Sequence, residues 1–368
     1  MATLEGSRWA TTLTTETPDP ILDLDDYVGQ RAATFRFDIV DSVTGYRETV
    51  TPLRDTVPIL SHDTARTITR QIMGLFLGVA DTALFNSITS RLEPFMVFAD
   101  GGTYPLGRYV PNNQVFFQST AGEQSSVTFY DESFIVDQPF SSSFGSSRSN
   151  EVLQETLIRC LEGLPITYTI ESSQFGATAA WSAGTRRGYA VEQIAIDGDW
   201  MSPWFDNNNI MRFIRSFDPA TREPTFDLDS GNKVKRDKVL RSNDVITAPN
   251  QFVVVSNGQS GIGVNSGPVV GVYNVPDSAP HSALNRGFVL TETQYRQLSY
   301  SSQAQAVAES LGQKQIIFET IELQTAPDPR HDGYDVLRWQ GANWLEIAWS
   351  LPMIEGSDMQ HVARRAYL

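Results

Sequence analysis

The sequence predicts an α+β fold dominated by antiparallel β-sheet. Three observations favour this class: short apolar segments that alternate with polar residues, turn residues between these segments, and few stretches with helical periodicity. The chain has 368 residues, more than the roughly 250–300 at which a single core stops growing, so we expect more than one domain. Its 40% hydrophobic content supplies enough apolar surface for packed cores.

An acidic arm is predicted for residues 1–31. Between Glu16 and Asp26 the sequence holds five acids and no base, interrupted by Pro18 and Pro20. Such a run is most often a solvated segment, and the alternative is a strand that docks on a neighbouring subunit.

The first β domain is predicted for residues 32–145. From Thr34 to Val40 apolar and polar residues alternate, as in a strand with one buried face. The step Asp100-Gly101 lies between two apolar stretches, which is the strongest short-range signal for a β-hairpin. Further strands are expected at residues 46–53, 114–118, 126–130 and 133–136.

A mixed α/β segment is predicted for residues 146–240. It follows a Ser- and Gly-rich linker at 140–150. Apolar residues then recur at helical spacing over 153–164, where Ser149 or Asn150 can cap the first turn. The sequence therefore predicts a helix directly after the linker.

The apolar and aromatic residues of this segment are interpreted mainly as core. Cys160 lies on the apolar stripe of the helix, so we interpret it as a small buried residue and not as a nucleophile. A second helix is expected at 210–217, ending before Pro219. Trp200 and Trp204 suit either a hydrophobic core or a platform for a ligand, and the core interpretation is favoured.

The second β domain is predicted for residues 241–368 and contains one helix. Thr291 and Gln294 match a capping box, so we expect a helix over 291–311. Gln340-Gly341 suits the turn of a late hairpin. Strands are expected at residues 245–247, 252–256, 269–275, 316–323, 334–339 and 343–351.

The charge argues against a protein that grips nucleic acid. With 43 acids and 28 bases the net charge is −15, whereas phosphate binding needs clustered Lys and Arg. Two interpretations stay open: a charge that serves solubility, or a surface that repels DNA and lets it slide.

The sequence also predicts a protein without disulfides or membrane spans. Cys160 is the single cysteine. The longest apolar stretch, 72–80, is far shorter than the roughly 20 residues that cross a bilayer. The N-terminus lacks the pattern of a secretory signal, so we expect a soluble product of a reducing compartment.

No catalytic, cofactor-binding or metal-binding residue is predicted, and no enzyme activity is expected. The acids of a D-x-D-x-G stretch, Asp227 and Asp229, resemble a calcium loop, but Gly231 comes one place early and Lys238 stands where a Glu is needed. Abundant acids leave glycosidase chemistry open, because it needs only two placed carboxylates. The four histidines are scattered without zinc-type spacing, at positions His62, His281, His331 and His361.

Four passages together resemble the tail-hub (baseplate-hub) and minor tail proteins of long-tailed bacteriophages. The most specific is LEPFMVFADGGTYPLGRYV at 92–110, followed by VTFYDES at 127–133. The others are VTPLRDTVPILSHDTARTITR at 50–70, SSSFGSSRSNEVLQETLIRCLEGL at 141–164 and QIIFETIELQTAPDPRHDGYDVL at 315–337.

The resemblance implies a homotrimeric hub in the virion, at the distal end of the tail. Each subunit would supply two tail-tube-like β-barrel domains, 32–145 and 241–368, so that three chains match a six-fold tube above to a three-fold tip below. The implied partners are the distal tail protein, the tape-measure protein and the tip or receptor-binding proteins. DNA would pass through the channel without specific binding, and assembly would take place in the host cytoplasm.

The alternative function is a carbohydrate-binding or wall-processing virion protein that uses Trp200 and Trp204. It requires exposed tryptophans at a concave site, whereas the hub requires them in the core. A Trp204→Ala substitution would then destroy folding in the hub and only affinity in the sugar-binding protein.

Overall fold

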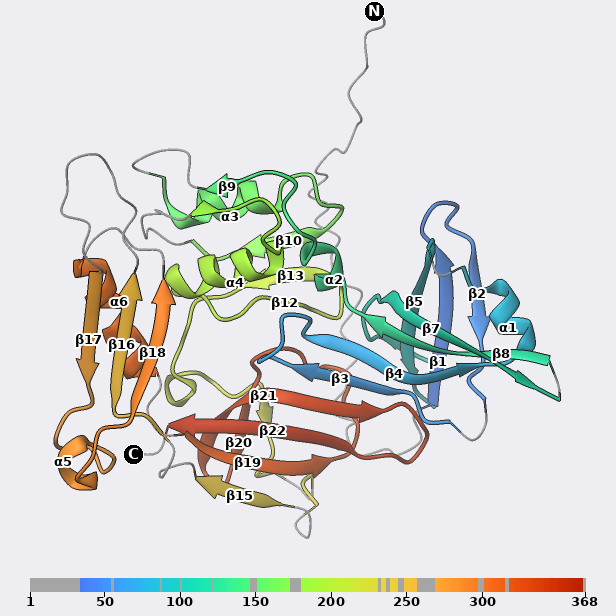
Figure 1. The fold of residues 1–368 in the computed structure, drawn as a ribbon. Helices are drawn as coiled ribbons and strands as arrows, with labels where there is room; N and C mark the ends of the chain where they lie inside the picture. Colours follow the sequence, from blue (N-terminus) through green and yellow to red (C-terminus); the bar gives the residue numbers. More distant parts are fainter. Residues whose placement is uncertain are drawn as a thin grey trace, which may run out of the picture.

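The computed structural model confirms a β-dominated α+β fold (Figure 1). It describes residues 34–53, 56–86, 88–99, 101–120, 122–145, 151–172, 180–230, 233–235, 239–243, 248–256, 269–296, 301–314 and 318–366. The acidic arm, the proposed helix caps Ser149 and Asn150, and the strand expected at 245–247 lie outside the described residues.

A ten-stranded sheet runs through the centre of the molecule. Its main path has the order β15-β19-β22-β21-β3-β4-β8-β7, with β20 paired to β21 and β14 to β20. The strands are β3 (Ile59–Asp63), β4 (Arg70–Leu77), β7 (Val110–Ser119), β8 (Gly122–Tyr130), β14 (Phe226–Asp227), β15 (Leu240–Asn243), β19 (Phe318–Thr325), β20 (Val336–Trp339), β21 (Ala342–Pro352) and β22 (Met359–Ala366).

This sheet joins strands that were predicted to lie in two different domains. Strand β3 pairs antiparallel with β21, so that Ser61 lies opposite Ser350. The hairpin predicted around Gln340-Gly341 is confirmed as β20 and β21. One hydrogen-bonded sheet thus crosses from the first β-rich segment to the last. The predicted domain boundaries stay a prediction.

A second sheet covers the first core. Strands β1 (Thr34–Asp41), β2 (Arg47–Val50), β5 (Ser90–Val97) and β6 (Thr103–Pro105) form it in the order β2-β1-β5-β6. Its apolar side chains pack with those of β3, β4 and β8 into one buried cluster, which also takes in Trp349 and Leu351 of β21. The predicted hairpin is confirmed: Phe98 donates its N–H to the carbonyl of Gly102 between β5 and β6.

The strand predicted at 133–136 is wrong, because these residues form the short helix α2 (Ser133–Val136). The carboxylate of Asp131 accepts the backbone N–H of Ser133 at 3.0 Å and turns the chain into a helical turn after β8. Another short helix, α1 (Val79–Leu84), follows β4.

The middle segment combines two helices with short strands. Its elements are β9 (Phe144–Gly145), α3 (Leu153–Leu161), β10 (Thr167–Ile170), β11 (Ala180–Trp181), α4 (Arg187–Asp197), β12 (Trp204–Phe205), β13 (Ile210–Phe213) and η2 (Pro219–Thr221). The predicted helix after the linker is confirmed as α3, which buries its apolar stripe, including Cys160, against α4. Burial raises the pKa of the Cys160 thiol to about 12, as expected of a structural residue.

The helix predicted at 210–217 is wrong. Strand β13 occupies its first half, between β10 and β12. The carboxylate of Asp206 accepts the backbone N–H groups of Asn208 and Ile210 and forms a tight turn with Asn209 at φ 60°. Met211 and Phe213 then alternate inward, so tertiary pairing overrides an apolar spacing that also fits a helix.

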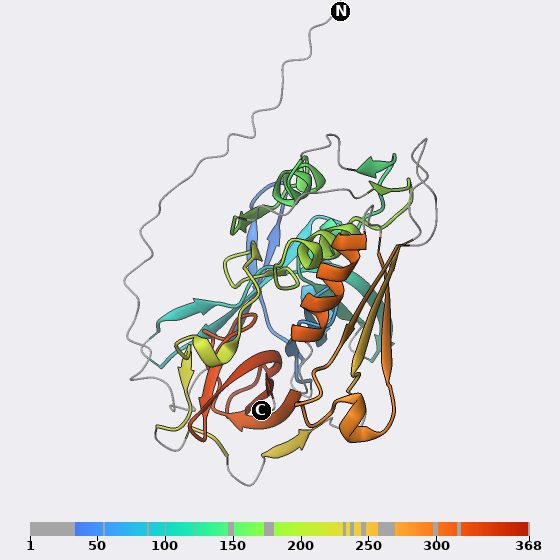
Figure 2. The same ribbon diagram turned by 90° about the vertical axis from the view of Figure 1, so that its left-hand side faces the viewer.

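A separate three-stranded sheet, with the order β17-β16-β18, and the helix that packs on it lie between β15 and β19 along the chain (Figure 2). The elements are β16 (Gln251–Ser256), β17 (Val269–Asn274), α5 (Ala283–Arg286), β18 (Thr291–Arg296) and α6 (Ser301–Lys314). The helix expected at 291–311 is wrong in its first part, because β18 pairs in parallel with β16. Helix α6 begins at Ser301 and packs on β16 and β17.

Within the part of the chain that the structure describes, no helix has the length and apolar character that a membrane span requires.

Candidate functional site: a buried His–Glu–His centre under the 328–335 loop

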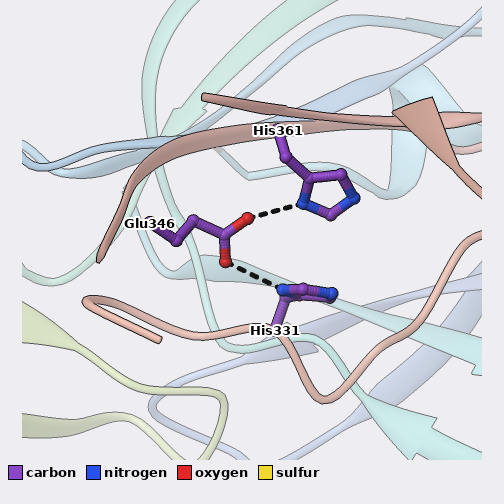
Figure 3. A group of neighbouring side chains, drawn as sticks. All are labelled: His331, Glu346 and His361. Carbon is purple, nitrogen blue, oxygen red and sulfur yellow. Dashed lines mark hydrogen bonds and ion pairs between the residues drawn. The ribbon is translucent and has the colours of Figure 1, made fainter. Parts of the chain in front are cut away.

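Three side chains from distant parts of the last segment meet beneath the loop 328–335 (Figure 3). His331 comes from the loop itself, Glu346 from β21 and His361 from β22. The Nδ1 atom of His331 lies 2.8 Å from Oε2 of Glu346, and Nδ1 of His361 lies 2.5 Å from Oε1. One carboxylate thus bridges two imidazoles.

The strand register places Glu346 and His361 together. Strands β21 and β22 are antiparallel, with Trp349 opposite His361 and Glu346 opposite Ala363. The register shifts between Glu346 and Ala348, and such a bulge re-aims the side chains on either side of it. All three side chains are at most 3% exposed, so water does not screen their charges.

The charges of this centre are strongly coupled. Burial by itself lowers the pKa of His331, but the adjacent Glu346, with Asp328 and Asp335, raises it to about 9. Burial raises the pKa of Glu346, and the two imidazoles outweigh it and lower the value to about 2. For His361 burial dominates and the pKa is lowered. The favoured state has a charged His331, an ionised Glu346 and a neutral His361.

Neighbouring groups hold both rings in place. Nε2 of His361 lies 2.8 Å from the hydroxyl oxygen of Thr325, and that hydroxyl also lies 2.8 Å from the carbonyl oxygen of Ala326. The ring of Phe226 stacks on His331, with centroids 3.9 Å apart. These contacts fix the orientation of the imidazoles relative to the carboxylate.

The same loop ties the first sheet to the middle segment through Arg70. Its guanidinium is fully buried and donates to the carboxylate of Asp332 and, at 2.7 Å, to Oδ1 of Asn207. Trp204 donates its indole N–H to the same Asp332 carboxylate at 2.9 Å, and Trp349 donates to the Asp332 carbonyl. This junction, formed by Arg70, Trp204, Asn207, Asp332 and Trp349, connects β4, the middle segment and β21.

Two of the four histidines lie together in the centre, and the other two lie elsewhere. His331 and His361 share the centre, although 30 residues of mostly strand sequence separate them and no metal-type spacing marks them. His62 is buried beside Trp349, with ring centroids 5.7 Å apart, and its ring nitrogens have no hydrogen-bond partner among the described residues. Burial and the charge of Arg70 lower the pKa of His62 well below its usual value. His281 is also buried and lies just before helix α5, outside the centre.

Sequence reasoning missed the centre, but one signal was present. Glu346 stands inside the apolar run of β21, where an ionisable residue is almost never fully buried without a partner. A search for the partner of a buried carboxylate leads to histidines. It does not identify them, because their positions depend on the strand register.

Both tryptophans singled out by the sequence are core residues. Trp200 is 2% exposed and packs in the core of the middle segment, and Trp204 is 4% exposed and packs edge-to-face on Tyr334. Neither presents a ring face to solvent. The sugar-binding alternative therefore loses the residues on which it depended.

The calcium-like stretch has a structural role. The carboxylate of Asp229 accepts the backbone N–H groups of Gln340 at 2.5 Å and Gly341 at 2.8 Å, so it holds the turn between β20 and β21. Asp227 accepts the N–H of Asp229 at 3.0 Å. These bonds agree with turn chemistry; Gly231 and Lys238 lie outside the described residues.

A surface hollow with a volume of about 450 Å³ lies in the described part of the chain. Its aromatic residues are Tyr130 and Tyr189, and the ion pair of Asp137 with Arg186 lies on its wall. Neither Trp200 nor Trp204 lines it. The hollow therefore does not restore the arrangement that the sugar-binding alternative required.

Comparison with solved structures identifies proteins of the same fold. The 43 kDa tail protein of prophage MuSo2 from Shewanella oneidensis has a TM-score of 0.60 at 9% identity, covering 90% of this chain and 98% of that one. A tail protein from Neisseria meningitidis has a TM-score of 0.57 at 11% identity, covering 90% and 97%. The prophage tail protein gp18 from Listeria monocytogenes has a TM-score of 0.56 at 10% identity, covering 89% and 94%.

The likeness extends over nearly the whole length of each of these three proteins, so this chain has the overall fold of a phage tail protein. No protein-family model matches the sequence, and no curated protein matches it.

Proposed function

We propose that this chain is a structural, non-enzymatic protein of a phage-type tail and acts as its hub. Three copies form a ring that adapts a six-fold tube and its distal tail protein to a three-fold tip. The ring encloses a passage for DNA, and the tape-measure and receptor-binding proteins are further partners. The hub belongs to the virion, at the distal end of the tail, and is assembled in the host cytoplasm.

The observation that carries this proposal is the fold likeness to phage tail proteins over almost their entire length. The four sequence passages add a separate argument, because their resemblance to tail-hub proteins rests on residue order and not on the fold. The buried tryptophans remove the main competing interpretation.

Open sheet edges support assembly with further copies. The ten-stranded sheet ends in β7 on one side and in β15 on the other, and within the described residues neither edge is covered by another strand. On β7, Val115 and Phe116 are about half exposed (54% and 53%). Native proteins avoid leaving such edges bare, and two different edges suit the head-to-tail contacts of a closed ring.

The net charge supports the passage. At −15 per chain, a trimer carries a large negative charge, and phosphate is repelled from a surface of that sign. DNA then passes such a wall without being held.

Light scattering on the purified chain, combined with negative-stain imaging, tests the proposal. We expect a mass three times the 40.9 kDa of one chain and particles that are rings with a central hole. A compact monomer at all concentrations would contradict the ring.

A pair of variants tests the sheet edge. Phe116→Lys places a charge on the apolar edge of β7, so we expect it to shift the trimer towards monomer while the circular dichroism of the fold is kept. Phe288→Lys is the control, because Phe288 is 52% exposed but lies outside every strand. If both variants dissociated equally, the added charge would act through general solubility, and the β7 edge would not be the contact between subunits.

A further inference from the structure

The His331–Glu346–His361 centre has the composition of a metal site. Among the residues that the structure describes, it is the one group of three or more histidine, cysteine or acidic side chains whose ligand atoms all lie close together, within 4.8 Å. Two imidazole nitrogens and one carboxylate oxygen are ligands that zinc and related transition cations prefer. All three groups are buried, so a bound ion would be shielded from water.

The second nitrogen of His361 has a neighbour that suits a metal-binding histidine. Its Nε2 lies 2.8 Å from the Thr325 hydroxyl oxygen, which also lies 2.8 Å from the carbonyl oxygen of Ala326. These contacts accommodate either tautomer of the ring. When Nε2–H donates to Thr325, the Nδ1 lone pair is available to a cation.

A divalent cation can take the place of the protons between the two rings and the carboxylate, with each Nδ1 and Glu346 as ligands. The Thr325 contact then takes the form typical of a metal-binding histidine, whose second nitrogen donates to a neighbouring oxygen.

The required movement is small. In a tetrahedral zinc site with bonds of about 2.0–2.1 Å, neighbouring ligand atoms are about 3.3 Å apart. The two Nδ1–carboxylate distances here are 2.8 and 2.5 Å, so these atoms separate by less than about 1 Å when an ion enters. The remaining ligand atoms, within 4.8 Å of one another, approach by at most about 1.5 Å.

Another carboxylate lies nearby, outside the group of three. Oδ2 of Asp335 lies 3.9 Å from Nδ1 of His331 and accepts the backbone N–H of Asp332. The carboxylates of Glu346 and Asp335 can together offset the charge of one divalent cation, which reduces the cost of an uncompensated buried charge. Arg330 already pairs with Asp328, so that pair leaves this balance unchanged.

We propose that His331, Glu346 and His361 bind one divalent transition cation, with the Asp335 carboxylate beside it, and that Zn²⁺ is the best match to the ligand set. The ion is structural: it pins the 328–335 loop to β21 and β22. Through Asp332 the same loop holds Arg70, so the ion stabilises the junction of the three segments.

The test uses the full chain without an affinity tag. It is refolded with and without Zn²⁺, freed of loose metal, and analysed by elemental mass spectrometry. We expect about one zinc per chain and a higher melting temperature with zinc. Co²⁺ in place of Zn²⁺ is expected to give the visible absorption of a tetrahedral site without a thiolate charge-transfer band, because Cys160 lies in another core. A thiolate band, or less than about 0.1 zinc per chain after refolding, overturns the proposal.

Variants identify the ligands. Glu346→Gln is expected to abolish stoichiometric binding, whereas Glu93→Gln, at a buried acid of the four-stranded sheet, is expected to bind zinc like the natural chain. Because Glu346→Gln can impair folding, Thr325→Val supplies a milder change of equal shape. It removes only the partner of His361 and is expected to weaken zinc binding about 10–100-fold, with Thr325→Ser restoring it. Unchanged zinc affinity in Thr325→Val, or in folded Glu346→Gln, overturns the assignment.

Discussion

Asp197, the last residue of helix α4, is an acid in an unfavourable place. Its Oδ1 atom is buried without a hydrogen-bond partner among the described residues, and it lies at the negative end of the helix dipole. Burial raises its pKa to about 6, against a smaller lowering by Arg296. The folded chain therefore binds this proton more tightly than the unfolded chain does.

The sign of the pH effect follows. The cost of ionising Asp197 grows as the pH rises from about 4 to about 6 and is complete above that. We expect Asp197→Asn to raise the free energy of unfolding by about 1–2 kcal/mol at pH 7.5 and by almost nothing near pH 4, measured by urea titration. Asp199→Asn is the control: Asp199 pairs with Arg215, so its loss is expected to destabilise instead.

Arg70 is the second residue whose change has a definite expected result. It is 1% exposed and pairs with Asp332, so Arg70→Met leaves the partly buried Asp332 carboxylate, 29% exposed, without its main partner. We expect a loss of about 3–5 kcal/mol in the free energy of unfolding. A double-mutant cycle with Asp332→Asn is expected to give a coupling energy of about 1–3 kcal/mol.

The exposed pair Arg66–Asp63 calibrates this cycle. Its side chains are 56% and 34% exposed, so solvent screens the attraction. Its coupling energy is expected below about 0.5 kcal/mol. A similar coupling in the two cycles would show that the Arg70 junction contributes no more than a surface pair.

At the scale of elements, the close contact of β17 with α6 depends on Gly271. A Cβ atom at this position would lie 2.2 Å from the backbone carbon and oxygen of Ala304 on the helix, far inside van der Waals contact. Ala304 and Ala308 keep the facing side of α6 narrow. The helix can therefore approach the sheet closely only where the strand lacks a side chain.

Gly271→Ala is expected to push α6 away from the sheet and to lower the free energy of unfolding by about 1–3 kcal/mol. If the sheet of β16, β17 and β18 unfolds separately from the ten-stranded sheet, hydrogen exchange should be faster in β16, β17 and α6 and unchanged in β3, β4 and β21. Val272→Ala, at the next and partly exposed position, is the control and should leave exchange nearly unchanged. Equal acceleration in the ten-stranded sheet would mean that both parts unfold together.

Elements whose signals are local were predictable, and those decided by tertiary pairing were not. The Asp100-Gly101 hairpin and helix α3 follow from turn chemistry and from one amphipathic stripe, and both are present. Strand β13 was predicted as a helix because its apolar residues fit both periods, and only its pairing with β10 and β12 decides between them. Strand β18 was concealed by a capping-box pattern for the same reason.

At the scale of the whole molecule, the class of fold was predictable, whereas the course of the main sheet was not. Alternation and turn residues indicate how many strands a sequence can form, but not which strands pair across long stretches of chain. The partners β3 and β21 carry no mutual signal. The His–Glu–His centre shares this limit, because it exists only once β21 and β22 are in register with the loop.

The pairing of β3 with β21 also imposes an order on folding during synthesis. Thr64, at the end of β3, hydrogen-bonds to Ile347, which follows 283 residues later. While the ribosome is still translating, β4, β8 and β7 can add in that order on one side of β3, but the other edge of β3 stays unpaired until β21 emerges. For most of its synthesis the nascent chain thus exposes a strand edge with unpaired backbone N–H and C=O groups, which can aggregate. The yield of folded protein should therefore depend more on the level of free chaperone in the cell than on the stability of the folded protein.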